Sequence, residues 1–196
     1  MPRSDEANLQ IRNARREHIL QVAERLFQEK DLTNIQIGEL AKAANMSLGL
    51  FYRYFDNKED LFLALVEKEA ATLTSMFLAV RQTEGCAIEK LHSLIKTMMA
   101  SIYQNPRQFL IIIQGLNHPG ESTLLVEKMK EIMKDTLLEL IIAAQAEGSI
   151  VQDDPDSLGI LILSSLQGLA SSITFFGCDA REQRPTAEQV MRLLKP

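Results

Sequence analysis

The stretch from Ile35 to Phe62, IQIGELAKAANMSLGLFYRYFDNKEDLF, decides the fold of this chain. Apolar residues in its first part follow the i, i+3, i+4 and i+7 spacing of one helix face: Ile37, Leu40, Ala41 and Ala44. This spacing predicts a short helix that buries one side.

Two turns join this helix to the elements that follow. Asn45 tolerates the left-handed backbone that a tight turn between helices needs. Ser47 is suited to cap a second helix over residues 48–54, because its side-chain oxygen accepts a hydrogen bond from an N–H two or three residues on. Asn57 and Asp60 resemble a capping box that starts a third helix. A helix, a turn and a second helix form the geometry that places one helix in a DNA major groove.

The pattern A41-x-x-A44-x-M46-S47-x-G49-x-x-Y52-x-Y54-F55-x-x-K58-E59-x-L61 resembles the DNA-binding domain of the tetracycline-repressor (TetR) family. The resemblance covers about residues 12–70 and is densest between Leu40 and Leu61. The alternative is a three-helix bundle that binds no nucleic acid. A bundle core has no need of two tyrosines and an arginine in one short helix, so the pattern favours the DNA-binding interpretation.

The resemblance implies a set of DNA-contacting residues, namely Gln36, Ser47, Leu48, Gly49, Leu50, Tyr52, Arg53 and Lys58. Tyr52 and Lys58 are expected at phosphates. Ser47, Leu48 and Arg53 are expected nearer to the base edges.

Three positions depart from the usual family pattern. The family usually has Gly at the position of Asn45 and Thr or Ser at that of Gln36, and it often has Thr at that of Leu50. The side chain of Gln36 is long enough to reach a phosphate. Leu50 cannot hydrogen-bond, so it is limited to apolar contacts such as a thymine methyl group. These departures affect the base preference and leave the fold unchanged.

The charge of the chain is negative, −5 at pH 7. Lysines and arginines do not outnumber acidic residues in the first 68 residues either. DNA binding therefore rests on local placement of basic side chains, for which the candidates are Arg12, Arg15 and Arg16 on the first helix, with Arg53 and Lys58 beside the motif. With so few candidates for phosphate contacts, we expect weak binding to non-specific DNA.

The remaining sequence is helical throughout, and it predicts an all-α protein of about nine helices. Residues 1–10 are expected to form a disordered arm before a first helix over about 12–30. Starts and ends of later helices are marked by capping residues, by proline at the first helical position and by glycine at the end. The predicted domains are a helix-turn-helix domain, 12–72, and a helical ligand-binding and dimerisation domain, 73–196, with their boundary inside the helix that starts near Lys58.

Composition and motifs argue against several other classes. The sequence has no H-E-x-x-H, C-x-x-C, G-x-S-x-G or phosphate-cradling glycine motif, so we expect a non-enzyme without metal or cofactor. Cys86 and Cys178 lie far apart, as in a cytoplasmic protein with reduced thiols. The first residues are charged and lack an apolar run, so we do not expect a signal peptide there. The apolar run 158–176 is interrupted by serines, Gln167 and Gly168, which argues against a membrane span.

The second domain carries a candidate pocket and a candidate interface. In the TetR family the effector pocket lies among the helices that correspond to residues 87–147 here. The tentative lining is His92, Met98, Met99, Tyr103, Phe109, Ile113, Asn117, Met129 and Met133. Methionine adapts to variable partners, but a filled core explains these residues equally well.

Ser164, Gly168 and Ser172 recur every four residues and form a small-residue stripe that lets another helix approach closely. The neighbour is either another helix of the chain or, as the resemblance implies, a second copy in a homodimer. A dimer presents two recognition helices to a pseudo-palindromic operator.

The sequence thus predicts a cytoplasmic, homodimeric transcriptional repressor that a small, largely apolar effector releases from its double-stranded DNA operator. The alternative is an adaptor of the same fold, whose C-terminal domain binds a protein partner.

Overall fold

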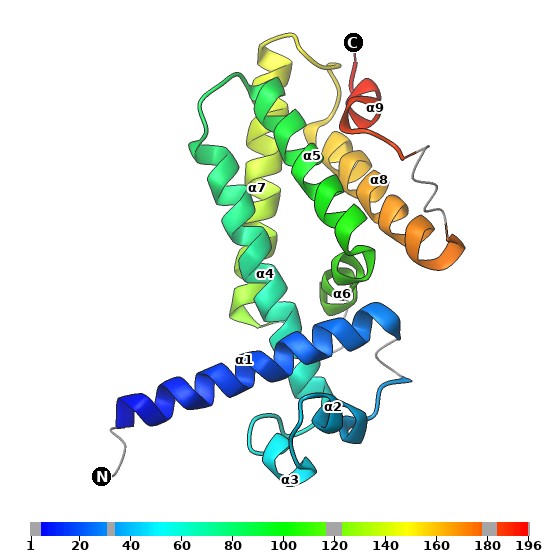
Figure 1. Cartoon of the computed structure of the whole chain (residues 1–196). Helices are drawn as coiled ribbons and strands as arrows, with labels where there is room; N and C mark the ends of the chain where they lie inside the picture. The colour runs from blue at the N-terminus through cyan, green and yellow to red at the C-terminus, as the bar shows by residue number, and fades with distance from the viewer. Residues whose placement is uncertain (1–4, 31–33, 117–122, 178–183, 196) are drawn as a thin grey trace. The chain divides into compact units, whose positions relative to one another are not determined.

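The structure is a computed structural model that describes residues 5–30, 34–116, 123–177 and 184–195. Within these ranges the chain is built from helices without a β-strand, as predicted (Figure 1). The described helices are α1 (Asp5–Glu29), α2 (Ile37–Ala43), α3 (Leu48–Phe51), α4 (Lys58–Gln82), α5 (Ala87–Gln104), α6 (Pro106–Leu116), α7 (Leu124–Ala146), α8 (Pro155–Phe176) and α9 (Ala187–Arg192).

The chain divides into two compact units, Met1–Val66 and Glu67–Pro196. The division falls inside α4, the helix in which the sequence places the domain boundary. The predicted functional limits, 12–72 and 73–196, put the boundary slightly later in the same helix and stay a prediction.

The first unit packs α1, α2, α3 and the start of α4 around one apolar core. Its fully buried side chains include Ile19, Leu40, Phe51, Phe55 and Leu61. Phe51 and Phe55 pack with ring centroids 5.9 Å apart. Burial of these large side chains supplies the main stabilisation of so small a unit.

Helix α1 begins earlier than predicted, because residues 5–10 are helical and not a disordered arm. These residues, DEANLQ, carry little apolar periodicity, so the sequence pattern gave no sign of burial there. Acidic residues near a helix N-terminus are favoured by the helix dipole, and Ala, Leu and Gln are good helix formers. Local preference therefore extends the helix beyond its buried stripe.

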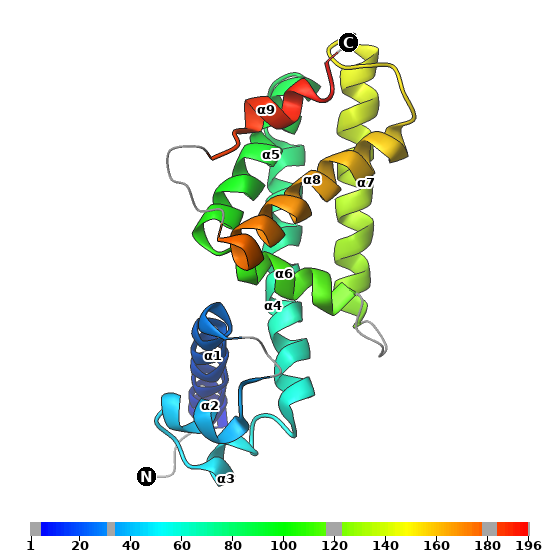
Figure 2. The same cartoon turned by 90° about the vertical axis from the view of Figure 1, so that its right-hand side faces the viewer.

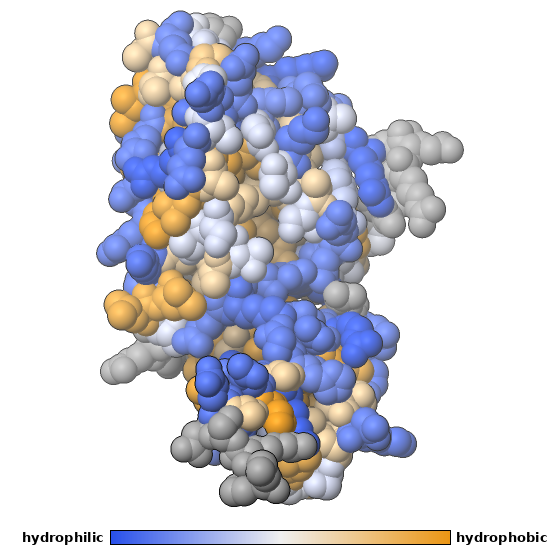
Figure 3. All heavy atoms as spheres, turned by 60° about the vertical axis from the view of Figure 1, so that its left-hand side comes forward, coloured by the Kyte–Doolittle hydropathy of each residue, from blue (hydrophilic) through white to orange (hydrophobic). Residues whose placement is uncertain are grey.

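In the second unit, α5, α7 and α8 pack against one another (Figures 1 and 2). Gly159 of α8 is buried against α7, and a Cβ added there would be in ordinary van der Waals contact with Leu137 Cδ2, at 3.5 Å. The core joins these helices to α4 and α9, since it includes Phe77 of α4, Leu91 of α5 and Ala187 of α9. On the face drawn in Figure 3, polar residues cover most of the surface, and the visible apolar residues lie in separate groups.

Most predicted helix ends in this unit are confirmed by their caps. The Asn105 side chain accepts from the backbone N–H of Gln108 at 3.2 Å, and α6 starts with the proline between them. Asp154 caps α8 at one end, and Gly177 closes the other end with φ of 63°. Thr186 and Gln189 form the expected capping box of α9.

Candidate nucleic-acid interface

The turn between α2 and α3 has the geometry that the sequence predicts. Asn45 adopts φ of 54°, in the left-handed region. The Ser47 side chain accepts a hydrogen bond from Leu50 N at 3.2 Å and so caps α3. Below α3, Phe51 is fully buried and fixes the helix to the core. The next helix is capped similarly, since Asp60 N donates to Asn57 Oδ1 at 2.7 Å.

These contacts leave most of the predicted DNA-contacting residues on the surface. Gln36, Ser47, Leu48, Gly49, Tyr52 and Arg53 are exposed, whereas Leu50 and Lys58 are partly buried. Leu48 is 47% exposed and Tyr52 is 46% exposed, which is high for large apolar or aromatic side chains next to a buried core. Ser47, Leu48 and Gly49 are exposed at the start of α3, and Tyr52 is exposed directly after its end.

Lys58 has a structural contact that the sequence gave no reason to expect. Its Nζ donates to the backbone carbonyl of Ile35 at 2.9 Å. Ile35 is buried and immediately precedes Gln36, the predicted phosphate contact. Lys58 thus ties the start of α4 to the start of α2, and its role at a phosphate stays a prediction.

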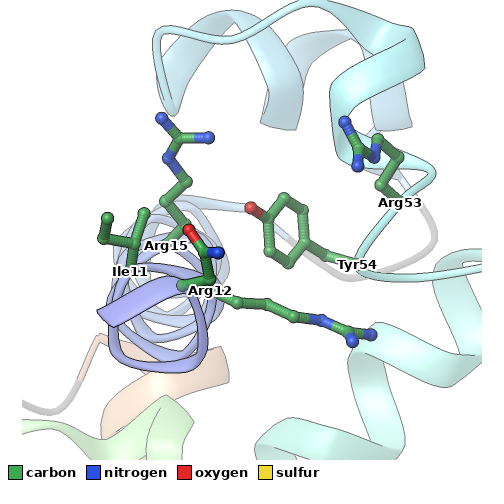
Figure 4. Close-up of a pocket in the computed structure, with 6 residues that line it drawn as sticks. Ile11, Arg12, Arg15, Arg53 and Tyr54 are labelled. Atoms are coloured by element: carbon green, nitrogen blue, oxygen red, sulfur yellow. The ribbon is translucent and has the colours of Figure 1, made fainter. Parts of the chain in front are cut away.

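Arg53 lies apart from the other predicted base-edge residues, at the rim of a hollow of about 590 Å³. The hollow is lined by Asn8, Ile11, Arg12, Arg15, Arg53 and Tyr54. Figure 4 shows the Tyr54 ring extending toward α1, with its hydroxyl at the α1 end. The sequence indicated the basic residues separately, but it did not bring residues of α1 together with the segment after α3.

The third arginine of the first helix has another environment. Arg16 places its guanidinium 5.1 Å from the centroid of the Phe55 ring. Such a cation–π contact holds α1 against the segment that follows α3. Arg16 is therefore a packing residue as well as a source of charge.

The predicted effector-pocket residues fall into several environments. Met98 and Met99 belong to the buried core of the second unit, and Tyr103, Phe109 and Met133 pack against that core. Met129 is buried and Ile113 is partly buried. Asn117 lies outside the described residues. The core methionines are thus grouped together, and their role as a ligand lining stays a prediction.

His92 and Tyr103 contact the C-terminal segment. His92 Nε2 lies 3.2 Å from Glu188 Oε1 on α9. The Tyr103 hydroxyl donates to the carbonyl of Pro185 at 2.6 Å, and the Arg184 guanidinium lies 4.8 Å from its ring centroid. Burial raises the pKa of the Tyr103 phenol above its ordinary value of 10.0, although the nearby Arg184 charge acts in the opposite direction.

The predicted interface stripe lies on an outward face of α8. Ser164 and Gly168 are exposed and Ser172 is partly exposed. Large apolar residues of the same helix are also exposed, among them Ile160 (65%) and Phe175 (64%). Helix α8 is long and apolar enough to cross a membrane by length and composition, and 28% of its most apolar stretch is buried within the chain.

Comparison with known proteins identifies the family. A model of the bacterial regulatory proteins of the tetR family matches residues 19–65. A model of the tetracyclin repressor-like C-terminal domain matches residues 84–171. Between them the two models match more than half of the chain. The chain belongs to the TetR family.

Curated relatives match part of the chain. An uncharacterized HTH-type transcriptional regulator of Mycobacterium tuberculosis is 36% identical over 90 residues, which are 46% of this chain and 45% of that protein. The HTH-type transcriptional regulator AcrR of Shigella flexneri is 28% identical over 121 residues, 60% of this chain and 56% of AcrR. The chain thus spans about half the length of these relatives.

A solved structure extends the likeness to almost the whole chain. AibR, in a crystal structure with isovaleryl coenzyme A and operator DNA, matches with a TM-score of 0.67 and 22% identity. The match covers 91% of this chain and 94% of that chain. At this level of identity the likeness shows the TetR fold in both units.

Proposed function

We propose that this TetR-family chain is a DNA-binding transcriptional repressor that acts in the cytoplasm. The observation that carries the proposal is the exposed surface of α3. Ser47 caps the N-terminal end of this helix, and the buried side chain of Phe51 anchors it to the core. A short helix held this rigidly, with Leu48 and Tyr52 turned to solvent, is suited to enter a major groove. In this proposal Tyr52 contacts a phosphate, and Ser47 and Leu48 contact the base edges.

The acting form in this proposal is a homodimer joined through α8. Its exposed face carries Ile160, Leu161 and Phe175 around the small stripe. Exposed apolar area of this kind on one helix is costly in water and is typical of an interface. Two copies related by a two-fold axis then present two α3 helices to the two halves of a pseudo-palindromic operator.

The second unit is proposed to bind a small effector that lowers operator affinity. Support comes from the adaptable methionines 98, 99 and 133, which lie in or against its core. AibR, which shares this fold, holds isovaleryl coenzyme A, so acyl-CoA thioesters are the first effector class to test. Their acyl chains also fit the expected largely apolar chemistry.

Selection of bound duplexes from a random DNA pool tests the DNA-binding proposal directly. We expect an enriched, two-fold symmetric sequence whose half-site spacing reports the distance between the two α3 helices. Leu48→Glu places a negative charge on the proposed DNA surface and should abolish the enrichment. Leu78→Glu alters an exposed leucine of α4 in the second unit and is the matched control. Equal enrichment by both variants would remove α3 from the DNA contact.

A second measurement tests the effector. The selected duplex is titrated with acyl-CoA thioesters of increasing chain length, with free coenzyme A as the control. Release by a thioester and not by free coenzyme A supports a ligand-responsive repressor. Operator binding that no thioester changes would contradict the acyl-CoA class.

A further inference from the structure

A hollow of about 460 Å³ opens on the surface of the second unit, between the start of α5 and α9. The two helices pack against each other (Figures 1 and 2), and residues of the chain between α7 and α8 line a third side. Three apolar residues contribute to the lining: Ile150 is buried, and Ile88 and Met191 are half-buried. Among the described residues of the predicted effector lining, His92 alone takes part, so this hollow is a separate candidate site.

The two carboxylates that line the hollow already have partners. Glu89 Oε2 accepts a hydrogen bond from Cys86 N at 3.3 Å, as part of the capping box of α5. Glu188 Oε1 lies 3.2 Å from His92 Nε2. A hydrogen bond from the Thr186 side chain and, to a smaller extent, the contact with His92 lower the pKa of the Glu188 carboxyl. Both acidic groups are thus engaged with the protein itself.

The two strongly basic groups of the hollow are not engaged in this way. Arg192 and Lys195 are exposed, and within the described part of the chain neither side chain has a hydrogen-bond or ion-pair partner. They stand three positions apart at the end of α9, and both face the hollow. The hollow therefore combines apolar side chains with two cations that are available to a ligand.

The walls of the hollow are held in place by contacts outside it. Val151 N donates to the Leu194 carbonyl at 2.8 Å and so joins the chain after α7 to the end of α9. The Gln145 side chain donates to the carbonyls of Val151 and Asp153 at 3.1 and 2.7 Å. A site whose walls are fixed before the ligand arrives loses less entropy on binding.

We propose that this hollow binds a small amphipathic carboxylate, whose charged group lies between Arg192 and Lys195 and whose apolar body packs on Ile88, Ile150 and Met191. The proposal concerns a second ligand site and goes beyond the operator and effector binding proposed above. Small-molecule sites are mostly apolar, with a few charged groups that fix the orientation of the ligand.

The charges of the hollow favour a carboxylate over a phosphate. The Arg192 guanidinium presents a planar fork of donors that matches the two oxygens of one carboxylate, and the Lys195 ammonium adds a point charge. Glu89 and Glu188 line the same hollow. Their negative charges repel a doubly charged phosphate more strongly than a singly charged carboxylate.

Calorimetric titration of the full chain with octanoate tests the proposal, with the neutral octanamide as the ligand control. We expect octanoate to bind and octanamide to bind more weakly by about tenfold or more, because a hydrogen bond to a charged group contributes about 1.5–3 kcal/mol. Affinity should rise from butanoate to octanoate, by up to about fourfold for each methylene that becomes buried. Equal binding of octanoate and octanamide would overturn the proposal, as would tighter binding of octyl phosphate.

The double substitution Arg192→Gln, Lys195→Gln removes both cations and keeps the side chains long and polar. Octanoate affinity should fall by about tenfold or more. The control Arg25→Gln, Lys128→Gln removes one arginine and one lysine at exposed positions outside the hollow and should bind octanoate as wild type does. Unchanged affinity in the first variant would place octanoate elsewhere, for example in the proposed effector core. An equal loss in both variants would mean that affinity follows net charge. Either result overturns the proposal.

The apolar part of the site has a test of its own. Met191→Gln keeps the length of the side chain and makes one wall of the hollow polar. It should weaken octanoate more than butanoate, because the longer chain covers more of that wall. Thermal unfolding without ligand establishes that each variant is folded. A folded Met191→Gln chain that binds the whole series as wild type does would overturn the assignment of this hollow.

Discussion

At the scale of single residues, the α2–α3 turn depends on one asparagine. Asn45 is the non-glycine residue with positive φ among the described residues, at 54°. A left-handed conformation costs an ordinary L-residue about 1–2 kcal/mol, whereas glycine adopts it readily. Asparagine lies between the two, because its short polar side chain tolerates this region. The usual family glycine at this position follows the same physical requirement.

Alanine and glycine at position 45 should therefore differ in their effect on stability. Asn45→Ala is expected to lower the free energy of unfolding by about 1 kcal/mol, and Asn45→Gly to leave it unchanged or raise it by a few tenths. Urea unfolding followed by circular dichroism measures both. Equal destabilisation by alanine and glycine would mean that an Asn45 side-chain contact, and not the backbone, determines the effect.

Lys58 combines a packing contact with a proposed phosphate contact, and the two can be separated. Its Nζ donates a hydrogen bond to the Ile35 carbonyl oxygen at 2.9 Å. Lys58→Ala should weaken binding to all DNA sequences alike and reduce the salt slope by about one. Lys96→Ala in the second unit is the control. Altered sequence preference with an unchanged slope would show that Lys58 acts only by positioning Gln36 and α2.

At the scale of elements, the sequence predicted helices well wherever capping chemistry is local. Ser47, Asn105 and Asp154 each form the predicted cap, because a cap depends on residues within one turn. The N-terminal extension of α1 was missed because residues 5–10 have no buried stripe, so helical periodicity could not reveal it. Side-chain partners between distant segments, such as Lys58 with Ile35, were missed because they depend on packing that spacing along the chain does not encode.

Helix α8 provides the prediction at this scale. Gly168 is exposed and no heavy atom lies within 4 Å of a Cβ built there, so the isolated chain tolerates a larger residue. Gly168→Glu should dissociate the dimer, since an unpaired charge buried in an interface is costly. Light scattering measures the mass of the assembly, and Ala100→Glu on an exposed position of α5 is the control. A folded Gly168→Glu variant that stays dimeric would remove α8 from the interface.

At the scale of the whole molecule, α4 is the helix that runs through both compact units. Within the second unit its buried Glu69 accepts a hydrogen bond from the Gln108 side chain of α6. A buried carboxylate needs such partners, because an unsatisfied charge in an apolar interior is expensive. Neither residue was singled out in the sequence, since a glutamate and a glutamine 39 positions apart carry no recognisable pattern.

This hydrogen bond offers a test of how an effector in the second unit weakens operator binding. If α6 moves α4 through Glu69, Gln108→Leu should reduce the coupling between the two sites and leave operator affinity without effector near that of wild type. The coupling in allosteric proteins is typically about 1–3 kcal/mol, or 5- to 150-fold in affinity. Because coupling is reciprocal, the factor by which an acyl-CoA lowers operator affinity must equal the factor by which operator lowers acyl-CoA affinity.

Both factors are measured by anisotropy and calorimetry in wild type, in Gln108→Leu and in the exposed control Gln104→Leu. Undiminished coupling in a folded Gln108→Leu variant would show that the signal reaches α4 by another contact.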